Sequence, residues 1–187
     1  NLHAEYAAES VRQAMVAQYG DEAYTRGLTV TTSLRSLDQR AAYKALREGV
    51  LTYDSRQRYR GPDAFIVLPA AKPARDEAID EALAEHPDNG DLVAAVVLEA
   101  SANRVVAQRQ DGEPFAITGN GLRAVQVALS AKASPAVQIR PGAVIRLLKA
   151  ANNEWRIVQL PEVESAFVAL DPHSGAVRAL VGGFDFQ

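Results

Sequence analysis

The sequence predicts an α+β protein in which a small antiparallel β-barrel is inserted into a helix-and-sheet lobe formed by the N- and C-terminal segments. Three observations carry this prediction. Residues 1–91 show helical periodicity with one strand, residues 92–160 consist of short apolar runs divided by turn residues, and residues 161–187 hold two apolar runs around a tight turn. We therefore expect a helical linker region, a barrel, and a hairpin that pairs with the N-terminal lobe.

The composition is typical of a globular protein, with 48% hydrophobic and 23% charged residues among 187. No apolar run approaches the roughly 18 residues that a membrane span requires, and the start does not have the pattern of a signal peptide. The absence of cysteine excludes disulfides and thiolate metal sites. Because the chain opens on Asn1 and stops at Gln187 directly after a predicted strand, we expect it to be part of a longer protein.

A helix and a strand open the chain. Residues 2–19 carry an amphipathic stripe that stops at Gly20. From Leu28 to Leu34 apolar and polar side chains alternate, which predicts a strand. We expect this strand to join the sheet of the C-terminal hairpin, because a two-stranded hairpin is only marginally stable by itself. The chain between Ser36 and Pro161 would then be an excursion from that sheet.

Two further helices are predicted before the barrel. Residues 36–53 have apolar positions three and four apart, and Ser36 and Gln39 have the spacing of a capping box. Residues 75–85 predict a short charged helix. The turn-forming residues that end at Asp91 follow it, and we place a domain boundary there.

The barrel segment predicts five short strands. They are expected at residues 92–99, 104–108, 114–118, 143–149 and 154–158. The first is apolar on both faces and therefore central in its sheet. Residues 122–129, between the third and fourth strands, fit either a helical turn or an extended connection. Five strands with one connecting element at this place are the pattern of an OB-like fold.

A ligand for such a barrel is difficult to identify from its residues. OB-like folds bind single strands through exposed aromatic side chains, and this segment offers Phe115 and Trp155. Trp155 stands in an apolar strand near Ile157, which favours a core position over a stacking platform. Residues 92–160 carry eight basic and four acidic side chains, a net charge of +4. That charge is too small to indicate nucleic-acid binding by itself.

The C-terminal segment predicts a β-hairpin. Its two apolar runs, residues 166–170 and 176–181, flank five turn-forming residues. Pro172 presets φ for the second position of a tight turn, the Asp171 carboxylate can accept hydrogen bonds from the backbone that follows, and Gly175 adopts positive φ without steric cost. Both faces of the hairpin are apolar, so both are expected to be covered.

Nucleophilic chemistry finds no support in the sequence. None of the nine serines is followed three positions later by a lysine, the spacing at which a lysine one helical turn on activates a serine. Ser130 precedes Lys132 by two positions, which is the wrong spacing for one helix face. Ser101 and Asn103 match a short Ser-x-Asn catalytic element, but a three-residue match without the other catalytic motifs is expected by chance.

Cofactor and metal motifs are equally weak. The glycines of residues 119–124 imitate a dinucleotide-binding turn, but no acidic residue follows at the distance needed to hold a ribose. His3, His86 and His173 are scattered, and residues 88–91 lack the alternating ligand order of a calcium loop. We therefore predict no catalytic, cofactor or metal residue in this stretch, and the sequence identifies no partner-binding residue.

Three stretches carry a family resemblance. They are residues 27–34 (GLTVTTSL) with Gln39, Ala41, Ala42 and residues 45–49 (ALREG), residues 59–62 (YRGP), and residues 167–186 from FVALDP to LVGGFDF. Together they resemble the class A penicillin-binding proteins, the bifunctional peptidoglycan synthases. The first two look like the region between the glycosyltransferase and transpeptidase domains, and the third looks like the first strands of the transpeptidase domain.

The resemblance implies a parent with peptidoglycan glycosyltransferase and serine-type D-Ala-D-Ala transpeptidase activities on the periplasmic side of the cytoplasmic membrane. In that family the barrel is an OB-like insertion, and the catalytic Ser-x-x-Lys follows the Gly182-Gly183 hairpin, beyond Gln187. No catalytic residue is carried over to this stretch, and no cofactor is implied. The implied partners are the two catalytic domains of the parent and, as in some family members, an outer-membrane lipoprotein activator. The membrane anchor would lie outside this stretch.

The sequence leaves three functions to compare. The first is a non-catalytic connecting and regulatory segment of a cell-wall synthase. The alternative is a stand-alone OB-type module that binds oligosaccharides or nucleic acid, which the net charge of residues 92–160 motivates and the scarcity of aromatic residues disfavours. An autonomous serine hydrolase, the third, has no base for any of its serines.

Overall fold

The structure, a computed structural model, describes residues 2–110 and 112–185. The chain forms two compact units. The first combines two separate segments, Asn1–Asp54 and Pro161–Gln187, and the second is Ser55–Leu160. Helices occur together with antiparallel sheets, which confirms the predicted α+β class. No helix in the described part of the chain is both long and apolar enough to span a bilayer.

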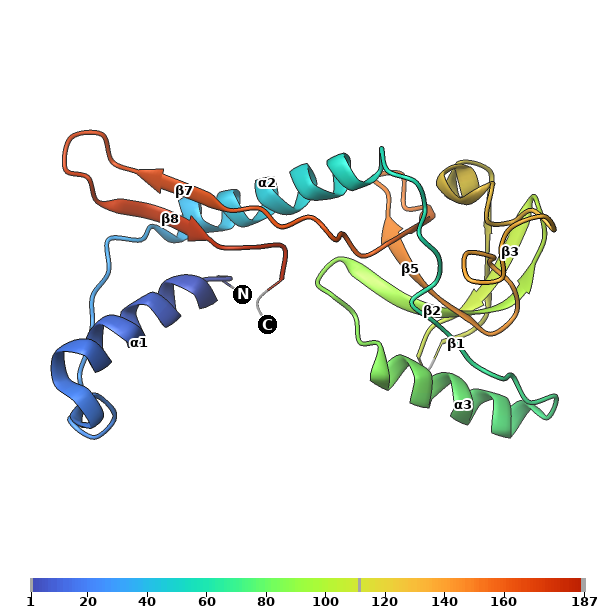
Figure 1. Cartoon of the computed structure of the whole chain (residues 1–187), viewed down its shortest axis with the longest axis horizontal. Helices are drawn as coiled ribbons and strands as arrows, with labels where there is room; N and C mark the ends of the chain where they lie inside the picture. The colour runs from blue at the N-terminus through green and yellow to red at the C-terminus, as the bar shows by residue number, and fades with distance from the viewer. Residues whose placement is uncertain (1, 111, 186–187) are drawn as a thin grey trace. The chain divides into compact units, whose positions relative to one another are not determined.

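The first unit packs helices against a hairpin (Figure 1). Its elements are α1 (Glu5–Tyr19), the 3₁₀-helix η1 (Gly20–Tyr24), α2 (Ser36–Asp54), β7 (Phe167–Leu170) and β8 (Val177–Val181). β7 and β8 pair antiparallel, with Val168 opposite Leu180. The face of α2 that is buried carries Ala42, Leu46 and Val50, which follow one another at the helical spacing of four positions.

The two strands of the hairpin differ in burial. Ala179 and Val181 of β8 are 0% and 2% exposed, because α1 and α2 pack on this strand. Phe167, Val168 and Leu170 of β7 are 40%, 55% and 59% exposed. The sequence predicts that both faces of the hairpin are covered. The described residues cover β8 but leave much of β7 exposed.

The predicted strand from Leu28 to Leu34 is wrong as a strand. In the described residues the hairpin sheet consists of β7 and β8, and residues 27–35 belong to no strand or helix. The predicted inner face is open, with Leu28 and Val30 38% and 42% exposed. The segment does reach β8 at its end, where the Arg35 amide donates to the Arg178 carbonyl at 3.0 Å. The segment is not a strand, because a single backbone hydrogen bond makes no ladder.

The second unit is a six-stranded antiparallel sheet with two helices. Its elements are β1 (Ala64–Phe65), α3 (Lys72–Glu85), β2 (Leu92–Ala100), β3 (Arg104–Gln108), β4 (Phe115–Thr118), the 3₁₀-helix η2 (Gly119–Val125), β5 (Ala143–Lys149) and β6 (Trp155–Val158). The strand order is β1-β5-β2-β3-β4, and β6 pairs with β5. β2 to β6 each begin and end within one residue of the five predicted strands. The connection predicted at residues 122–129 is partly 3₁₀-helix and partly turn.

The predicted barrel is not closed. In the described residues β4 and β6 approach each other without forming a ladder. η2 contacts both strands, and its Gly121 lies so close that an added Cβ would overlap the Ile117 side chain of β4 and the Trp155 carbonyl of β6. The backbone of η2 thus occupies the place where a closing pair of strands would meet, and only glycine fits there.

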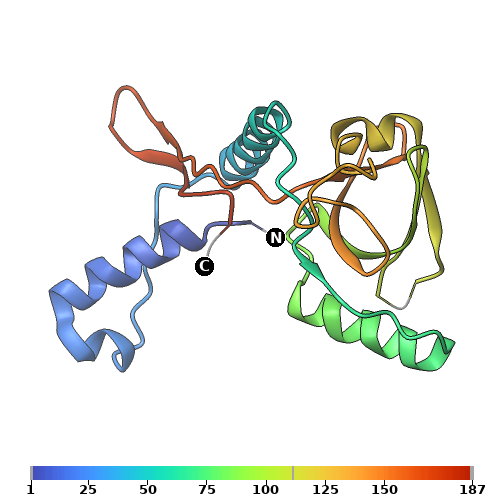
Figure 2. The ribbon, with the colours of Figure 1, turned by 45° about the vertical axis from the view of Figure 1, so that its right-hand side comes forward.

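The second unit has apolar cores on both faces of its sheet. On one face Ala95 and Val97 of β2 pack with Leu122 and Val125 of η2, and on the other Ala94 and Val96 pack with α3. The views in Figures 1 and 2 place α3 and the gold η2 region on opposite sides of the sheet. β2 is central and buried on both faces, which confirms the interpretation of its continuous apolar run.

The second unit begins earlier than the boundary that we placed at Asp91. Residues 55–91 pack with the sheet, because β1 pairs with β5 and Ile79 of α3 is fully buried against β2. α3 also starts at Lys72 rather than at Arg75. Pro73 occupies its first turn, where the missing N–H leaves no hydrogen bond unmade, so this proline begins the helix instead of interrupting it.

Candidate functional site

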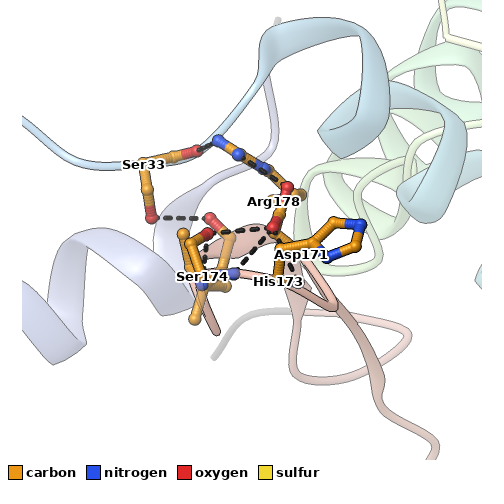
Figure 3. Close-up of polar contacts among 7 residues, drawn as sticks. Ser33, Asp171, His173, Ser174 and Arg178 are labelled. Carbon is orange, nitrogen blue, oxygen red and sulfur yellow. Dashed lines mark hydrogen bonds and ion pairs between the residues drawn. The ribbon is translucent and has the colours of Figure 1, made fainter.

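The turn of the hairpin is a dense polar site in the first unit, and Figure 3 shows its contacts. The Asp171 Oδ1 atom accepts hydrogen bonds from the backbone N–H groups of His173 and Ser174 at 3.1 and 2.9 Å and from the Ser174 hydroxyl at 3.0 Å. Gly175 has φ +70° and donates its N–H to the Asp171 carbonyl. These contacts confirm the predicted turn and the roles of Asp171 and Gly175 in it.

A basic side chain completes the turn. The Arg178 Nη2 atom lies 2.9 Å from Asp171 Oδ2, and both side chains are 25% exposed. The Arg178 guanidinium and the donors of Ser174 and His173 hold the pKa of the Asp171 carboxyl well below its usual range. Asp171 is therefore anionic near neutrality, and its lowered pKa makes it a weak general base.

The sequence Asp171-Pro172-His173-Ser174 brings together the residue types of a catalytic triad, but the geometry does not make one. The Ser174 hydroxyl donates to Asp171, and the contact of His173 to that carboxylate comes from its backbone N–H. In Figure 3 the imidazole ring of His173 is directed away from Ser174. A triad needs the imidazole between the hydroxyl and the carboxylate, so this arrangement stabilises a turn and does not activate a nucleophile.

The same arginine connects the turn to the segment before α2. Arg178 Nη1 is 3.5 Å from the Ser33 carbonyl, and the Ser33 hydroxyl donates to the Val177 carbonyl at 2.8 Å. These contacts and the Arg35 amide join residues separated by more than 140 positions in the sequence. The hairpin is thus fixed in register against the segment that leads into α2.

Gln39 is the second polar element that fixes the hairpin. Its side chain is fully buried, and its amide donates to the Leu180 carbonyl at 2.8 Å while its carbonyl accepts from the Leu180 N–H at 2.8 Å. The amide also donates to the His3 carbonyl at 2.7 Å. The predicted capping box is therefore wrong, because Gln39 bonds the backbone of β8 and of the N-terminal segment instead of the start of its own helix.

The aromatic pair of the second unit offers little free ring surface. Phe115 and Trp155 have ring centroids 5.9 Å apart and pack against the main core while remaining partly exposed. The cationic groups of Arg109 and Lys149 lie 5.7 and 5.3 Å from the Trp155 ring centroid. A ring that is packed below and flanked by two cations is a poor stacking platform for bases or sugars.

The remaining motifs of the sequence have structural roles. The Ser130 hydroxyl accepts from the Lys132 backbone N–H at 3.2 Å, and the Ser101 hydroxyl exchanges hydrogen bonds with the backbone of Arg104 in a turn. Asp88 accepts from the Ala94 N–H at 2.8 Å and so stabilises the entry into β2. Among the described residues, none of these groups meets a partner that would give it catalytic character.

The histidines and acidic residues do not assemble a metal site in the described part of the chain, where no three of them come together. The His3 ring stacks on Tyr43 with centroids 3.8 Å apart. Sequence reasoning missed Arg47 and gave Gln39 the wrong role; both side chains are buried on α2. The only sequence signal for these two residues is that each is a polar residue at a helical position that should face the core.

Comparison with known proteins agrees with this architecture. Residues 59–163 match the family model of the penicillin-binding protein OB-like domain. The chain is 36% identical over its whole length to penicillin-binding protein 1A of Pseudomonas aeruginosa, and 97% of it is 38% identical to penicillin-binding protein 1A of Neisseria lactamica. It spans 23% of the length of each of these relatives.

A solved structure covers nearly the same stretch. The crystal structure of penicillin-binding protein 1A from Haemophilus influenzae superposes with a TM-score of 0.78 and 32% sequence identity. The superposition covers 96% of this chain and 26% of that one. Similarity therefore extends over both units and includes the helices and the hairpin as well as the OB-like segment.

Proposed function

Since the chain belongs to the class A penicillin-binding proteins and contains their OB-like domain, we propose that it is the connecting and regulatory part of a bifunctional peptidoglycan synthase. In this proposal α1 and α2 follow a glycosyltransferase domain, and the hairpin of β7 and β8 begins a penicillin-sensitive transpeptidase domain. The parent is anchored in the cytoplasmic membrane outside this stretch, and the two units lie on its periplasmic side.

The observation that carries the proposal is the split construction of the first unit. Residues 1–54 and 161–187 form one compact body, held together by Gln39 and Leu180, which are 141 positions apart in the sequence. The chain therefore leaves the first unit after Asp54, forms the OB-like unit, and returns to the first unit at Pro161. A connection of this kind suits a segment that links two catalytic domains while it presents a separate unit to a partner.

The exposed side of the hairpin supports the position at the start of a larger sheet. Phe167, Val168 and Leu170 leave apolar surface on β7, next to the open edge of a two-stranded sheet in the described residues. Soluble proteins rarely leave a strand of this kind uncovered. In the proposed parent the following strands of the transpeptidase domain cover it.

The test starts with the gene. The reading frame should encode a Ser-x-x-Lys sequence soon after Gln187 and a glycosyltransferase domain with a membrane anchor before Asn1. The full-length protein should then polymerise lipid-linked disaccharide precursor and be labelled by a fluorescent penicillin. A reading frame that closes near both ends would overturn the proposal and leave the OB-like unit as a binding module.

A regulatory role belongs to the OB-like unit in this proposal. Phe65 of its short edge strand β1 is 38% exposed, and Val67, two positions beyond that strand, is 88% exposed; the Arg140 guanidinium lies 4.2 Å from the Phe65 ring centroid. An apolar edge with a cation beside it fits a protein partner that adds backbone hydrogen bonds and an acidic group. We take the partner to be an outer-membrane lipoprotein activator, as the family resemblance implies.

A pair of variants tests this role in the full-length synthase. Val67→Asp should weaken activator binding at least tenfold and abolish stimulation of glycan synthesis, while basal polymerisation is unchanged. Val127→Asp is the matched control, because Val127 is 66% exposed in the same unit outside this edge. Equal binding by both variants would assign the docking surface elsewhere.

A further inference from the structure

The chain that follows β8 is held by side chains of α1 and α2. Arg47 Nη1 donates to the Phe184 carbonyl at 2.9 Å, and the Tyr6 hydroxyl donates to the Asp185 carbonyl at 2.7 Å. One position before the end of β8, Gln39 holds both backbone groups of Leu180. All of these contacts are made to backbone atoms. They therefore fix the path of the chain and do not depend on which side chains it carries.

Arg47 is built into this contact. It is 5% exposed, and its guanidinium lies 3.9 Å from the Phe184 ring centroid while donating to the carbonyl of the same residue. Phe184 is itself 8% exposed. A planar guanidinium can stack on a ring and donate in its plane at the same time, which a lysine ammonium cannot do.

Two glycines allow the close approach of Tyr6. A Cβ atom added to Gly182 would overlap the Tyr6 ring, and one added to Gly183 would lie 2.6 Å from the Tyr6 hydroxyl. The ring therefore rests directly on the peptide backbone. Figures 1 and 2 show this stretch, drawn in dark red, turning from β8 toward the first turn of α1.

We propose that Tyr6, Gln39 and Arg47 are positioning residues for the transpeptidase reaction of the complete protein. They form a clamp that sets the direction in which the chain leaves β8 and so places the nucleophile-bearing segment that comes after it. The inference rests on the proposed function, since it requires a transpeptidase domain that begins with this hairpin. It assigns to the connecting helices a direct role in shaping the second active site.

The physical reason is the steep dependence of acyl transfer on geometry. A displacement of about 1 Å in a reacting group can cost on the order of a hundredfold in rate. Contacts to three backbone carbonyls within six residues remove the freedom of the chain at this exit point. Loss of the clamp should therefore slow acylation and leave the distant polymerisation reaction unchanged.

The test compares Tyr6→Phe, Arg47→Lys and Arg47→Met in the full-length synthase. The second-order rate of acylation by a fluorescent penicillin should fall about threefold in Tyr6→Phe and about tenfold in both Arg47 variants, with glycan polymerisation at the wild-type rate. Tyr53→Phe and Arg40→Met are matched controls, because both residues are exposed on α2. Hydrogen exchange of residues 181–185 should be faster in the three clamp variants than in the controls.

The outcomes separate the two proposals. A wild-type protein that is not acylated at all defeats the proposed function. A wild-type protein that is acylated, with clamp variants that match Tyr53→Phe and Arg40→Met, overturns the inference and leaves the function intact. A parallel loss of acylation and polymerisation in Tyr6→Phe, the mildest change, also overturns it, because general unfolding would then explain both.

Discussion

The two units are stabilised by different means. The second unit buries its sheet on both faces, with Val96, Ile145 and Leu147 fully inaccessible to solvent. The first unit also buries apolar side chains, among them Leu46, Val50 and Val181, and its hairpin is held in addition by side chains that bond backbone, such as Gln39 and Arg178. The first unit therefore adds specific polar contacts over long sequence distances to the apolar burial that organises the second.

The difference follows from what each unit must do in the proposed synthase. A unit with a complete core keeps its own shape whatever is attached to it. A unit held by backbone contacts fixes the course of one chain segment while leaving its strand β7 open to further structure. We expect core substitutions in the second unit to act on the whole unit, and polar substitutions in the first unit to act locally.

The largest effect is expected for Leu147→Ala in β5. Leu147 is fully buried in the main core, and its truncation should lower the free energy of unfolding of the second unit by about 3 to 4 kcal/mol through lost burial and a residual cavity. Chemical denaturation followed by Trp155 fluorescence measures it. Val127→Ala, at an exposed position, should change the midpoint little, and equal effects of the two would contradict a core at Leu147.

A smaller and more local effect is expected for Gln39→Leu. The substitution places an apolar side chain of similar size on the buried face of α2 but leaves the two backbone groups of Leu180 and the His3 carbonyl without their partner, at a cost of about 2 kcal/mol. Hydrogen exchange at Leu180 should quicken while the second unit keeps its unfolding midpoint. A shift in that midpoint equal to the change at Leu180 would show that the two units unfold together.

The sequence predicted best where a pattern is local. The turn at Asp171 and Gly175 follows from the preferences of those residues, and the double-sided burial of β2 follows from an unbroken apolar run. Gln39 was misjudged because the Ser36 spacing offered a local partner, whereas its real partner lies 141 positions away. Contacts between side chain and distant backbone leave no periodic signal.

The remaining errors have physical causes of the same kind. The alternation from Leu28 to Leu34 indicates that one face should be covered, but it does not identify the element that covers it. In the described residues only the end of this segment reaches β8. The prediction of a closed barrel was wrong because Gly121 of η2 lies between β4 and β6, and no strand pattern in the sequence encodes this contact. The clamp of Tyr6, Gln39 and Arg47 was least predictable, because Arg47 looks like an ordinary polar residue of an amphipathic helix.

The same substitution should have opposite consequences in the two units. The Tyr59 hydroxyl is buried without a hydrogen-bond partner among the described residues, and burial, with the charge of Asp63, raises the pKa of its phenol. Tyr59→Phe should therefore stabilise the second unit by about 1 kcal/mol. Tyr6→Phe, in contrast, removes a hydrogen bond to Asp185 and should loosen the first unit. Thermal unfolding of both variants decides the signs, and a destabilised Tyr59→Phe protein would mean that its hydroxyl has a partner.

The smallest effect concerns the hairpin turn in acid. The pKa of Asp171 is depressed in the folded protein below its ordinary value of 3.8, so the carboxylate stabilises the turn fully above about pH 4. This contribution is lost as the pH falls from there through the lower folded pKa. The amide resonance of Ser174, which donates to Asp171, should therefore move with a midpoint well below pH 4.

Two variants make this titration specific. Asp171→Asn cannot titrate, so the Ser174 resonance should stay constant over the same range. His173→Ala should titrate like the wild type, because His173 contributes its backbone N–H and not its ring. A midpoint at or above pH 4 in the wild type would show that Arg178 and the turn donors do not favour the anion. The Asp171 contacts would then add nothing to the backbone pairing that stabilises the hairpin turn. Polar contacts would stabilise the first unit less than the buried contacts of Gln39 and Arg47 suggest.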